Sequence, residues 1–346
     1  MEFAHKLAES SWSKNEKQLL ISGLKRFNPS DTDGLFEGDV WKRGIVLAQS
    51  GFDFVKQQVE KNAPLSIFVG YSPGRSHLGY IVMRNLLNSL RNYGNTHILL
   101  GINAQESMKT HRRSLEETLR ISEIVERVLL GGRNEEQITR IYDLPYLNCP
   151  GVQKDYSKVY SEVSGALSVA DFKKIMGWSE ETALSEYISL LGAITGMMYP
   201  SAKSTEDASL VFTDLKHLPF VRLAKKVAHK IGAREPSFLV TNALPSLSDG
   251  EKRMSSLGGD STLYLFKEEE YDKFSRVRTG GRARGEQELY GGNPDSCLAL
   301  NIAAFIINSE ETEKTVTACI SGKQSSCREC KAIMKKHIKK EGDAVK

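Results

Sequence analysis

Short apolar runs alternate with helix-like stretches through the middle of the chain. "LSIFVG" (65–70) and "THILLGIN" (96–103) are apolar runs of strand length, and "LGYIVMRNLLNSLRNYG" (78–94) between them repeats its apolar positions with a helical period. "ASLVFTD" (208–214) and "SFLVTNALP" (237–245) predict two further strands. Strands that are apolar throughout and alternate with helices are typical of a parallel sheet covered on both faces. The pattern therefore predicts an α/β fold.

The same pattern divides the chain into three parts. Residues 1–55 are mostly polar and predict an N-terminal extension. Residues 56–264 hold the predicted sheet, which a largely helical insertion interrupts at about 105–205. Residues 265–346 have the pattern of successive helices, and we expect an all-helical C-terminal domain there.

Composition narrows the class of protein without identifying it. The 346 residues are 40% hydrophobic and 26% charged, which is ordinary for a globular protein. No apolar run approaches the roughly 18 residues of a membrane helix, and the mixed, charged N-terminus does not look like a signal peptide. We therefore expect a cytoplasmic protein without a membrane partner. The net charge of +4 permits a polyanionic partner.

A glycine-bearing turn stands where open parallel sheets bind ligands. "GYSPGRSHLGY" (70–80) joins the first of these strands to its helix, at the carboxyl end of the strand. Gly70 and Gly79 let a ligand approach the backbone, and a helix N-terminus favours phosphate. His77 can donate a hydrogen bond to a phosphate oxygen. A histidine that only caps the helix is the plainer alternative.

A second glycine-bounded stretch carries adjacent cations and hydroxyls. "DGEKRMSSLGG" (249–259) follows the last predicted strand. Lys252 and Arg253 can neutralise phosphate charge, and Ser255 and Ser256 can donate to phosphate oxygens. By itself the stretch could equally be a solvated loop.

Together the two stretches resemble the signatures of class I aminoacyl-tRNA synthetases, His-Ile-Gly-His and Lys-Met-Ser-Lys-Ser. "HLGY" stands for the first signature and "RMSSL" for the second. Three more segments are similar to tryptophanyl enzymes of the eukaryotic and archaeal type: "WKRGIVLAQSGFDFV" (41–55), "TGGRARGEQELYGGNPDSC" (279–297) and "CISGKQSSCRECK" (319–331). The tyrosyl enzymes are the nearest rivals, because the spacing of the turn is closer to theirs. The "TGGR…GGNPD" motif favours tryptophan.

This resemblance implies a Rossmann-type catalytic domain and a two-step reaction. Tryptophan and ATP, with Mg²⁺ on the phosphates, give tryptophanyl-adenylate and pyrophosphate, and the tryptophan then passes to tRNA. By position, the ATP-facing residues would be Gly70, Ser72, Pro73, His77, Gly79, Tyr80 and Met254. The catalytic residues would be His77 and, from a mobile loop that closes on the phosphates, Lys252, Arg253, Ser255 and Ser256.

The chain departs from the family pattern at several of these positions. Tyr80 replaces the second histidine of the first signature, and Arg253 replaces a lysine, which keeps the charge but changes the shape of the head group. In the implied amino-acid pocket the family's polar residues are replaced by Phe68, Leu100, Gln105 and His217. An unpaired polar group on a buried ligand costs roughly 1–3 kcal/mol, so two such groups would weaken tryptophan binding a hundredfold or more.

Three functions therefore remain open from the sequence. The first is a working tryptophan–tRNA ligase with altered motifs. The second is a synthetase-like nucleotide- or RNA-binding protein that has lost aminoacylation. The third is a different nucleotidyl transferase on the same fold, which would leave the "TGGR…GGNPD" motif unexplained.

Four of the five cysteines gather near the C-terminus. Cys297, Cys319, Cys327 and Cys330 are separated by 21, 7 and 2 residues, and a Cys-x-x-Cys pair in such a chain favours metal over a disulfide. Some tryptophanyl enzymes have a similar pattern that holds a four-iron cluster, so the resemblance implies iron–sulfur. The chemistry also permits zinc or four reduced thiols. We expect the isolated Cys149 to be buried.

Two basic segments and one apolar segment predict macromolecular partners. "RVRTGGRAR" (276–284) and "KAIMKKHIKK" (331–340) could contact tRNA phosphates, with an ordinary solvated helix as the alternative for the second. Family members dimerise through the insertion, so the resemblance makes "EYISLLGAITGMM" (186–198) a candidate homodimer interface. Buried core is the equal alternative for that stretch.

Overall fold

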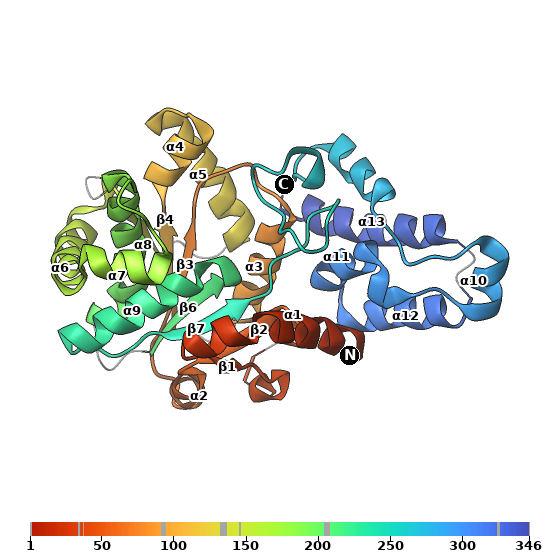
Figure 1. The fold of residues 1–346 in the computed structure, drawn as a ribbon, viewed down its shortest axis with the longest axis horizontal. Helices are drawn as coiled ribbons and strands as arrows, with labels where there is room; N and C mark the ends of the chain where they lie inside the picture. Colours follow the sequence, from red (N-terminus) through yellow and green to blue (C-terminus); the bar gives the residue numbers. More distant parts are fainter. Residues whose placement is uncertain are drawn as a thin grey trace.

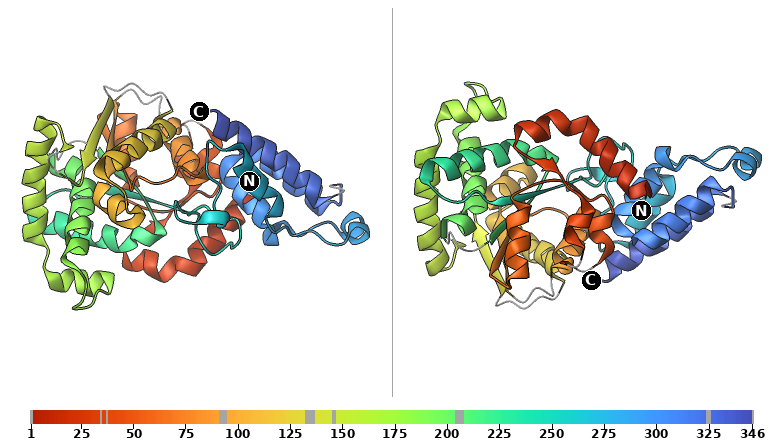
Figure 2. Two further views of the ribbon diagram at one scale, coloured as in Figure 1. Left: turned by 90° about the horizontal axis from the view of Figure 1, so that it is seen from above. Right: turned by 90° about the horizontal axis from the view of Figure 1, so that it is seen from below.

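The computed structural model describes residues 2–33, 35–36, 38–90, 95–131, 137–144, 147–203, 208–323 and 326–345. Its central feature is a seven-stranded sheet with the order β1-β2-β7-β6-β3-β4-β5. The helical insertion lies at one end of an elongated molecule and the helical C-terminal domain at the other (Figures 1 and 2).

Five parallel strands form the core of the sheet: β3 (Leu65–Tyr71), β4 (Thr96–Ile102), β5 (Ile138–Tyr142), β6 (Ala208–Asp214) and β7 (Ser237–Thr241). Four of them are the apolar runs predicted from the sequence, and the α/β fold class is confirmed. β5 was missed. It lies inside the range assigned to the insertion, and only two of its five residues, Ile138 and Ile141, are buried.

The N-terminal segment belongs to the sheet and is not a detached extension. After α1 (Glu2–Ile21), the strands β1 (Lys25–Arg26) and β2 (Val46–Ser50) form an antiparallel edge, in which β2 pairs with β7. This edge makes the sheet mixed rather than fully parallel. The short helices η1 (Pro29–Thr32) and η2 (Asp39–Lys42) lie between the two edge strands.

Helices cover both faces of the sheet. On one face, the buried residues of β3 and β4 pack with α3 (Leu78–Ser89), α5 (Leu115–Leu130) and α2 (Phe52–Glu60). On the other face, they pack with α8 (Leu184–Lys203) and α9 (Leu218–Ile231). Because side chains alternate along a strand, each of these strands serves both cores, which explains why the runs are apolar throughout.

The helical insertion is shorter than the sequence suggested. It consists of α6 (Pro150–Ala166), α7 (Val169–Met176) and α8, whereas α4 (Ala104–His111), α5 and β5 belong to the sheet domain. Half of the apolar residues of 186–198 are core, because Leu190, Ile194, Met197 and Met198 are all under 8% exposed.

This arrangement bears on two expectations, the apolar dimer interface at 186–198 and the burial of Cys149. Among the described residues of the insertion, the large apolar side chains that are exposed are Leu184 and Ile188, at the beginning of α8, and Val169 in α7. Cys149 is exposed just before α6, contrary to the expected burial, because it precedes the helix instead of facing its core.

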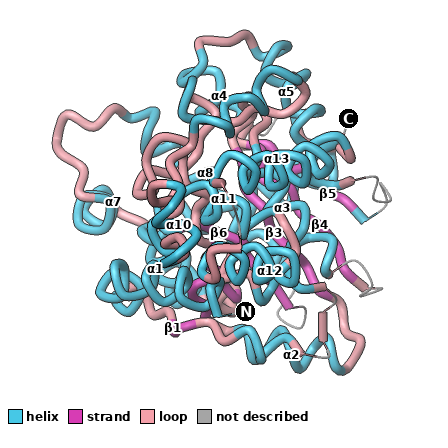
Figure 3. The backbone as a smooth tube through the Cα atoms, turned by 90° about the vertical axis from the view of Figure 1, so that its right-hand side faces the viewer, coloured by secondary structure: helices cyan, strands magenta, loops and turns pink. Residues whose placement is uncertain are grey.

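The C-terminal domain is built from helices that stand in front of the sheet when it is viewed from that end (Figure 3). They are η7 (Glu268–Arg276), α10 (Arg284–Tyr290), η8 (Pro294–Ser296), α11 (Leu298–Ile306), α12 (Ser309–Ile320) and α13 (Cys327–Asp343). The eight apolar and small residues of α11 are almost completely buried, so this helix is the hydrophobic centre of the domain.

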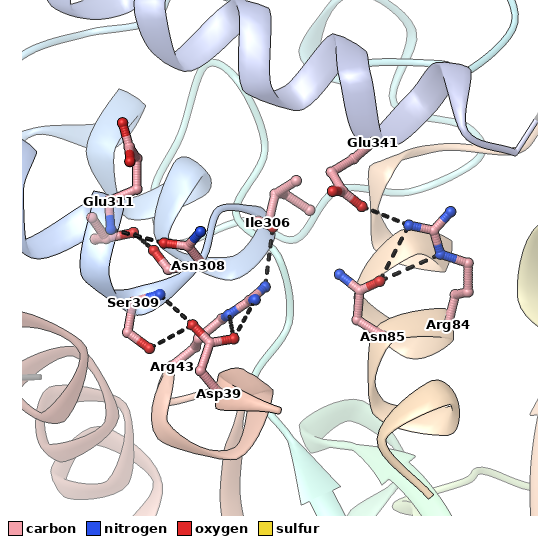
Figure 4. A network of polar contacts seen from close by, with 10 residues as sticks. Asp39, Arg43, Arg84, Asn85, Ile306, Asn308, Ser309, Glu311 and Glu341 are labelled. Atoms are coloured by element: carbon pink, nitrogen blue, oxygen red, sulfur yellow. Dashed lines mark hydrogen bonds and ion pairs between the residues drawn. The ribbon is translucent and has the colours of Figure 1, made fainter. Parts of the chain in front are cut away.

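Polar contacts fasten this domain to the rest of the chain (Figure 4). Asp39 in η2 accepts hydrogen bonds from Arg43 and from the Ser309 hydroxyl at 2.7 Å, at the beginning of α12. Arg43 also donates to the Ile306 carbonyl at 3.0 Å. Burial raises the pKa of Asp39, but the hydrogen bonds from Arg43 and Ser309 together lower it by more. The pKa of Asp39 therefore lies below the ordinary value of 3.8.

A second contact joins α3 to α13. The Arg84 guanidinium lies 2.7 Å from the Glu341 carboxylate, and the arginine side chain is only 8% exposed (Figure 4). An ion pair therefore connects α3, which begins beside the predicted phosphate-binding turn, to α13.

No helix among the described residues is long and apolar enough to cross a membrane.

The Arg84–Glu341 pair should contribute measurably to stability. Because Arg84 is buried and Glu341 is partly exposed, Arg84→Met should lower the free energy of unfolding by about 2 kcal/mol. The control is Lys25→Met in the exposed Lys25–Asp53 pair, which should cost less than about 0.5 kcal/mol. Urea unfolding measures both, and equal losses would show that the interdomain pair has no special role.

Candidate functional site

Several chain segments meet at the carboxyl edge of the parallel strands. The turn 72–76 leaves β3, the short helix η5 (Leu215–His217) follows β6, and the long loop after Thr241 leaves β7. Adjacent parallel strands end at the same edge, so the two stretches singled out in the sequence are brought to one place although they are far apart in the chain.

Backbone hydrogen bonds bind the segment that follows the second stretch to the first stretch. The Leu265 N–H donates to the Ser76 carbonyl at 2.9 Å, and the Leu78 N–H donates to the Leu263 carbonyl at 3.3 Å. His77 and Tyr264 face each other in this short antiparallel bridge. The loop that carries Arg253 is thus anchored on its C-terminal side to the beginning of α3.

His77 caps α3 in a defined tautomer. Its Nδ1 accepts a hydrogen bond from the Gly79 N–H at 3.1 Å, which leaves the proton on Nε2. Burial, with a smaller effect of the Arg253 charge, lowers the pKa of His77 to about 4, so the ring is neutral at pH 7. A Cβ at position 79 would lie 2.8 Å from the His77 ring, which explains the glycine. His77 can therefore cap α3 through Nδ1 and donate a hydrogen bond through Nε2–H at the same time.

Residues of α4, and Arg113 just after it, support the turn. Ser72 donates to Glu106, and the Pro73 carbonyl accepts hydrogen bonds from Ser107 and Arg113. The Tyr80 ring lies 4.9 Å from the His77 ring, centroid to centroid, and burial raises the pKa of the Tyr80 phenol. Tyr80 is therefore a neutral packing partner of His77 at physiological pH.

The second stretch folds as a small hairpin. Pro245 pairs with Arg253 across it, and the Met254 N–H donates to the Leu244 carbonyl at 2.7 Å. The Met254 side chain is 5% exposed, so it anchors the loop in the core. Met254 and the two serines that follow therefore have different environments.

The two serines make different contacts. The Ser255 carbonyl accepts a hydrogen bond from the Thr262 hydroxyl at 2.9 Å. Ser256 lies so close to Gly74 that a Cβ at position 74 would stand 2.6 Å from the Cβ of Ser256. The loop and the turn are thus in direct contact, and glycine at position 74 is what permits it.

Arg253 is held by a carboxylate at the end of β6. Its guanidinium lies 2.6 Å from Asp214, whose other oxygen lies 2.9 Å from Nδ1 of His217. Burial raises the pKa of Asp214, but the hydrogen bond and charge of His217 and the charge of Arg253 outweigh it and hold the pKa at about 2. Lys252 is exposed and pairs with Asp249 at 3.7 Å, away from this cluster.

The structure thus brings together His77, Tyr80, Arg253, Ser256 and His217, and it leaves Lys252 apart. His217, expected in the amino-acid pocket, lies in the Arg253 cluster instead. Sequence reasoning missed Asp214 and Glu106. Asp214 is the polar residue that closes an apolar strand at the ligand-binding edge, and this signal could have revealed it.

The residues expected in the amino-acid pocket are on different surfaces. Phe68 pairs in register with Leu99 and belongs to the core under α8, whereas Leu100 faces the opposite core. One side-chain pocket cannot include both Phe68 and Leu100, because neighbouring residues of a strand point to opposite faces. The Phe68 ring fills the space in front of two glycines: a Cβ at Gly101 or Gly196 would lie 2.3 Å or 2.8 Å from it.

Gln105 lies at the start of α4, above the end of β4. Its backbone N–H and that of Ala104 donate to Asp143, which follows β5. Burial raises the pKa of Asp143 to about 6, even though these backbone hydrogen bonds lower it. A carboxylate of this chain therefore occupies the N-terminus of α4.

The chain is similar to known tryptophanyl enzymes over nearly its whole length. It is 27% identical to the tryptophan–tRNA ligase of Pyrobaculum aerophilum over 311 residues, which cover 86% of this chain and 80% of that protein. The fold superposes on the tryptophanyl-tRNA synthetase of Aeropyrum pernix K1 with a TM-score of 0.82 at 20% identity, covering 97% and 93% of the two chains. No protein-family model matches the chain.

The chain is a distant homologue of tryptophanyl-tRNA synthetases of the archaeal and eukaryotic type. The fold is also similar to the tyrosyl-tRNA synthetase of Aeropyrum pernix, with a TM-score of 0.69 at 15% identity, covering 89% and 94% of the two chains.

The four clustered cysteines of this synthetase homologue converge in the C-terminal domain. A Cβ at Gly281 would lie 2.2 Å from the Cys327 sulfur, and one at Gly292 would lie 2.6 Å from the Cys319 sulfur. Burial and the neighbouring thiols, Cys297 among them, raise the pKa of Cys330 to about 12. Within the described residues, no three His, Cys, Asp or Glu side chains stand close enough to share a metal ion.

The basic helix α13 uses several of its cations inside the molecule. Lys335 and Lys339 form ion pairs with Asp272 and Glu268 of η7, and Lys331 donates to the carbonyls of Ser275 and Val277. Part of the charge of 331–340 therefore holds η7 in place. The remaining exposed lysines of the helix are Lys336 and Lys340.

The proximity of Arg253 to His77 predicts a shift in a titration. NMR of the His77 ring should show a pKa near 4, and Arg253→Met should raise it toward the ordinary 6.5, because a nearby positive charge is removed while burial remains. The unfolded chain binds the proton more tightly, so the stability due to neutral His77 is present above pH 6.5 and declines as the pH falls toward 4.

The matched control for this titration is Lys252→Met, which removes an equal charge from the same loop but should leave the His77 pKa unchanged. Equal shifts from both substitutions would mean that the loop does not hold Arg253 at the turn.

Proposed function

We propose that this protein is a tryptophan–tRNA ligase with diverged signature motifs, which activates tryptophan with ATP and transfers it to tRNA. The observation that carries the proposal is the contact between the Arg253 loop and the His77 turn at the ligand-binding edge of the sheet. The two stretches that resemble the class I signatures are the two that lie together there.

In the proposed reaction the tryptophan carboxylate attacks the α-phosphorus of ATP, and pyrophosphate leaves with the electrons of the broken P–O bond. The phosphates lie at the N-terminus of α3, where His77 donates from Nε2. Arg253 exchanges its Asp214 partner for a phosphate oxygen and stabilises the developing charge of the leaving group. ATP enters as its magnesium complex, and we assign no carboxylate of the chain to that ion.

The other partners follow from the family and from exposed surfaces. We propose that tRNA contacts the basic segments 276–284 and 331–340 of the C-terminal domain, where Arg276, Arg278 and Arg282 lie before α10. A homodimer would use the insertion, where Leu184 and Ile188 are exposed. We place the protein in the cytoplasm.

We also propose that the four clustered cysteines bind a thiophilic metal, as an iron–sulfur cluster or as zinc. Four thiols are a suitable donor set for either, and glycines 281 and 292 leave room for two of the sulfurs. The thiols must move closer to one another on binding, because no three of them stand at ligand spacing as described. The metal would supply a structural link between the beginning of α11, where Cys297 lies, and the helices α12 and α13.

A second candidate is a nucleotide-binding protein of the same fold that does not activate amino acids. Two observations favour it. Phe68 fills the space beside Gly101 and Gly196 with a ring that cannot hydrogen-bond to an indole N–H. Asp214 competes with phosphate for the Arg253 guanidinium. Both features would slow activation without abolishing ATP binding.

ATP binding should depend on Arg253 and on the His77 Nε2 atom. Arg253→Met should weaken ATP binding by roughly 10–100-fold, because a charged hydrogen bond contributes about 1.5–3 kcal/mol. His77→Asn keeps an oxygen in the position of Nδ1, and so keeps the cap, but lacks Nε2; it should weaken binding by roughly tenfold.

Isothermal titration calorimetry measures these affinities. Lys252→Met is the control and should stay within about twofold of the original affinity, because an exposed ion pair contributes little. Unchanged ATP affinity in both Arg253→Met and His77→Asn would show that ATP does not bind at this edge of the sheet.

Amino-acid activation should be slow and selective for tryptophan. ATP–pyrophosphate exchange should be at least about 100-fold slower than in an enzyme with intact signatures, because misplacement of about 1 Å costs that much. Restoring the family residues with Arg253→Lys and Tyr80→His together should raise the rate.

Each amino acid is tested in turn, with tyrosine as the critical comparison. Exchange with tyrosine alone would contradict the tryptophan assignment. Absence of any exchange in a protein that still binds ATP would establish the second candidate in place of the first.

A further inference from the structure

One buried amide in the C-terminal domain lacks a partner next to the cysteines. Gln287 in α10 is 2% exposed, and its Nε2 atom has no hydrogen-bond partner among the described residues. Buried N–H groups are almost always paired, so an unpaired one requires an explanation.

The orientation of this amide is fixed by its other end. The Gln287 Oε1 atom accepts a hydrogen bond from the Arg282 backbone N–H at 2.9 Å. Turning the amide over would place an NH₂ group against that N–H, so the assignment of nitrogen and oxygen is determined by chemistry. The NH₂ group must therefore face away from Arg282.

The NH₂ group points to the space that the cysteine sulfurs border. A Cβ at Gly292 would lie 2.6 Å from the Cys319 sulfur and 3.0 Å from the Gln287 Nε2 atom. A Cβ at Gly281 would lie 2.2 Å from the Cys327 sulfur and 3.4 Å from Oε1 of the same amide. The amide nitrogen thus lies near the Cys319 sulfur and the amide oxygen near the Cys327 sulfur, where glycines 292 and 281 leave room.

We propose that the Gln287 NH₂ group donates a hydrogen bond to the Cys319 sulfur when the four cysteines bind their metal. A thiol is a weak acceptor, whereas a metal-bound thiolate carries negative charge and accepts strongly. Metal binding would thus satisfy the unpaired N–H and offset part of the charge that four thiolates bring together. Gln287 is a positioning and tuning residue for the metal, and this role rests on the metal site proposed above.

The decisive variant is Gln287→Glu. It keeps an oxygen for the Arg282 N–H but replaces the donor with a second, negatively charged oxygen beside the sulfur. Its control is Glu286→Gln, which makes the opposite exchange at an exposed position of the same helix. Gln287→Met, which removes the donor without adding charge, serves if the first variant does not fold.

Affinity is measured by anaerobic titration of the full-length protein with Co²⁺, followed by the sulfur-to-cobalt charge-transfer absorption. Gln287→Glu should weaken Co²⁺ binding by roughly 10–100-fold and shift the absorption, as loss of an outer-shell hydrogen bond does, whereas Glu286→Gln should match the original protein. After reconstitution with ferrous iron and sulfide, Gln287→Glu should lower the reduction potential of the cluster, because N–H···S bonds stabilise its reduced form.

Cys319→Ser separates the two possible failures. If Cys319→Ser binds Co²⁺ and iron as well as the original protein does, the metal site itself is absent. If Cys319→Ser loses the metal while Gln287→Glu matches the original protein in affinity, absorption and potential, the metal site stands and the role of Gln287 is overturned.

Discussion

The short backbone bridge between residues 76–78 and 263–265 is the constraint on which the candidate site depends. Its two hydrogen bonds join the beginning of α3 to the segment that follows the Arg253 loop. The core strand β3 fixes one side of the bridge, and Leu263 and Leu265, both under 4% exposed, fix the other. The Arg253 loop begins after the buried strand β7 and ends at these leucines, so it can carry exposed cations and hydroxyls without losing its position.

The charges of Asp214 and Arg253 determine where the arginine lies and which protonation state His77 has. Asp214 lies at the end of β6 with its pKa held at about 2, so it stays ionised and keeps Arg253 beside the turn. The same positive charge helps to keep His77 neutral, which gives the histidine a single N–H donor directed away from its cap. A ligand with several negative oxygens would be the natural competitor for Arg253.

The C-terminal domain is coupled to this site through α3. His77 begins the helix, and Arg84, two turns later, is bound to Glu341 near the end of the chain. Asp39 and Arg43 fasten α11 and α12 in the same way (Figure 4). Two of the four clustered cysteines lie in α13, so this helix joins the cysteine cluster to α3, the helix that His77 caps.

Much of the fold could be predicted from short segments of the sequence. The strands of the sheet core, other than β5, are continuous apolar runs, and such runs are recognisable wherever both faces of a strand are covered. β5 escaped because three of its five residues are not buried, and β1 escaped because it has two residues, so their hydrophobic signal is weak. The two signature-like stretches were recognisable because their glycines, cations and hydroxyls are arranged along the sequence itself.

What the sequence could not decide was which of these side chains meet. Lys252 and Arg253 are neighbours with the same charge, yet only Arg253 reaches Asp214, because the hairpin turns successive side chains in opposite directions. Phe68 and Leu100 seemed to share a pocket until the register of β3 and β4 placed them on opposite faces. The sequence determined the types of residue, the strands and the family likeness. The tertiary structure determined the partners, because strand register and loop direction depend on contacts between distant segments.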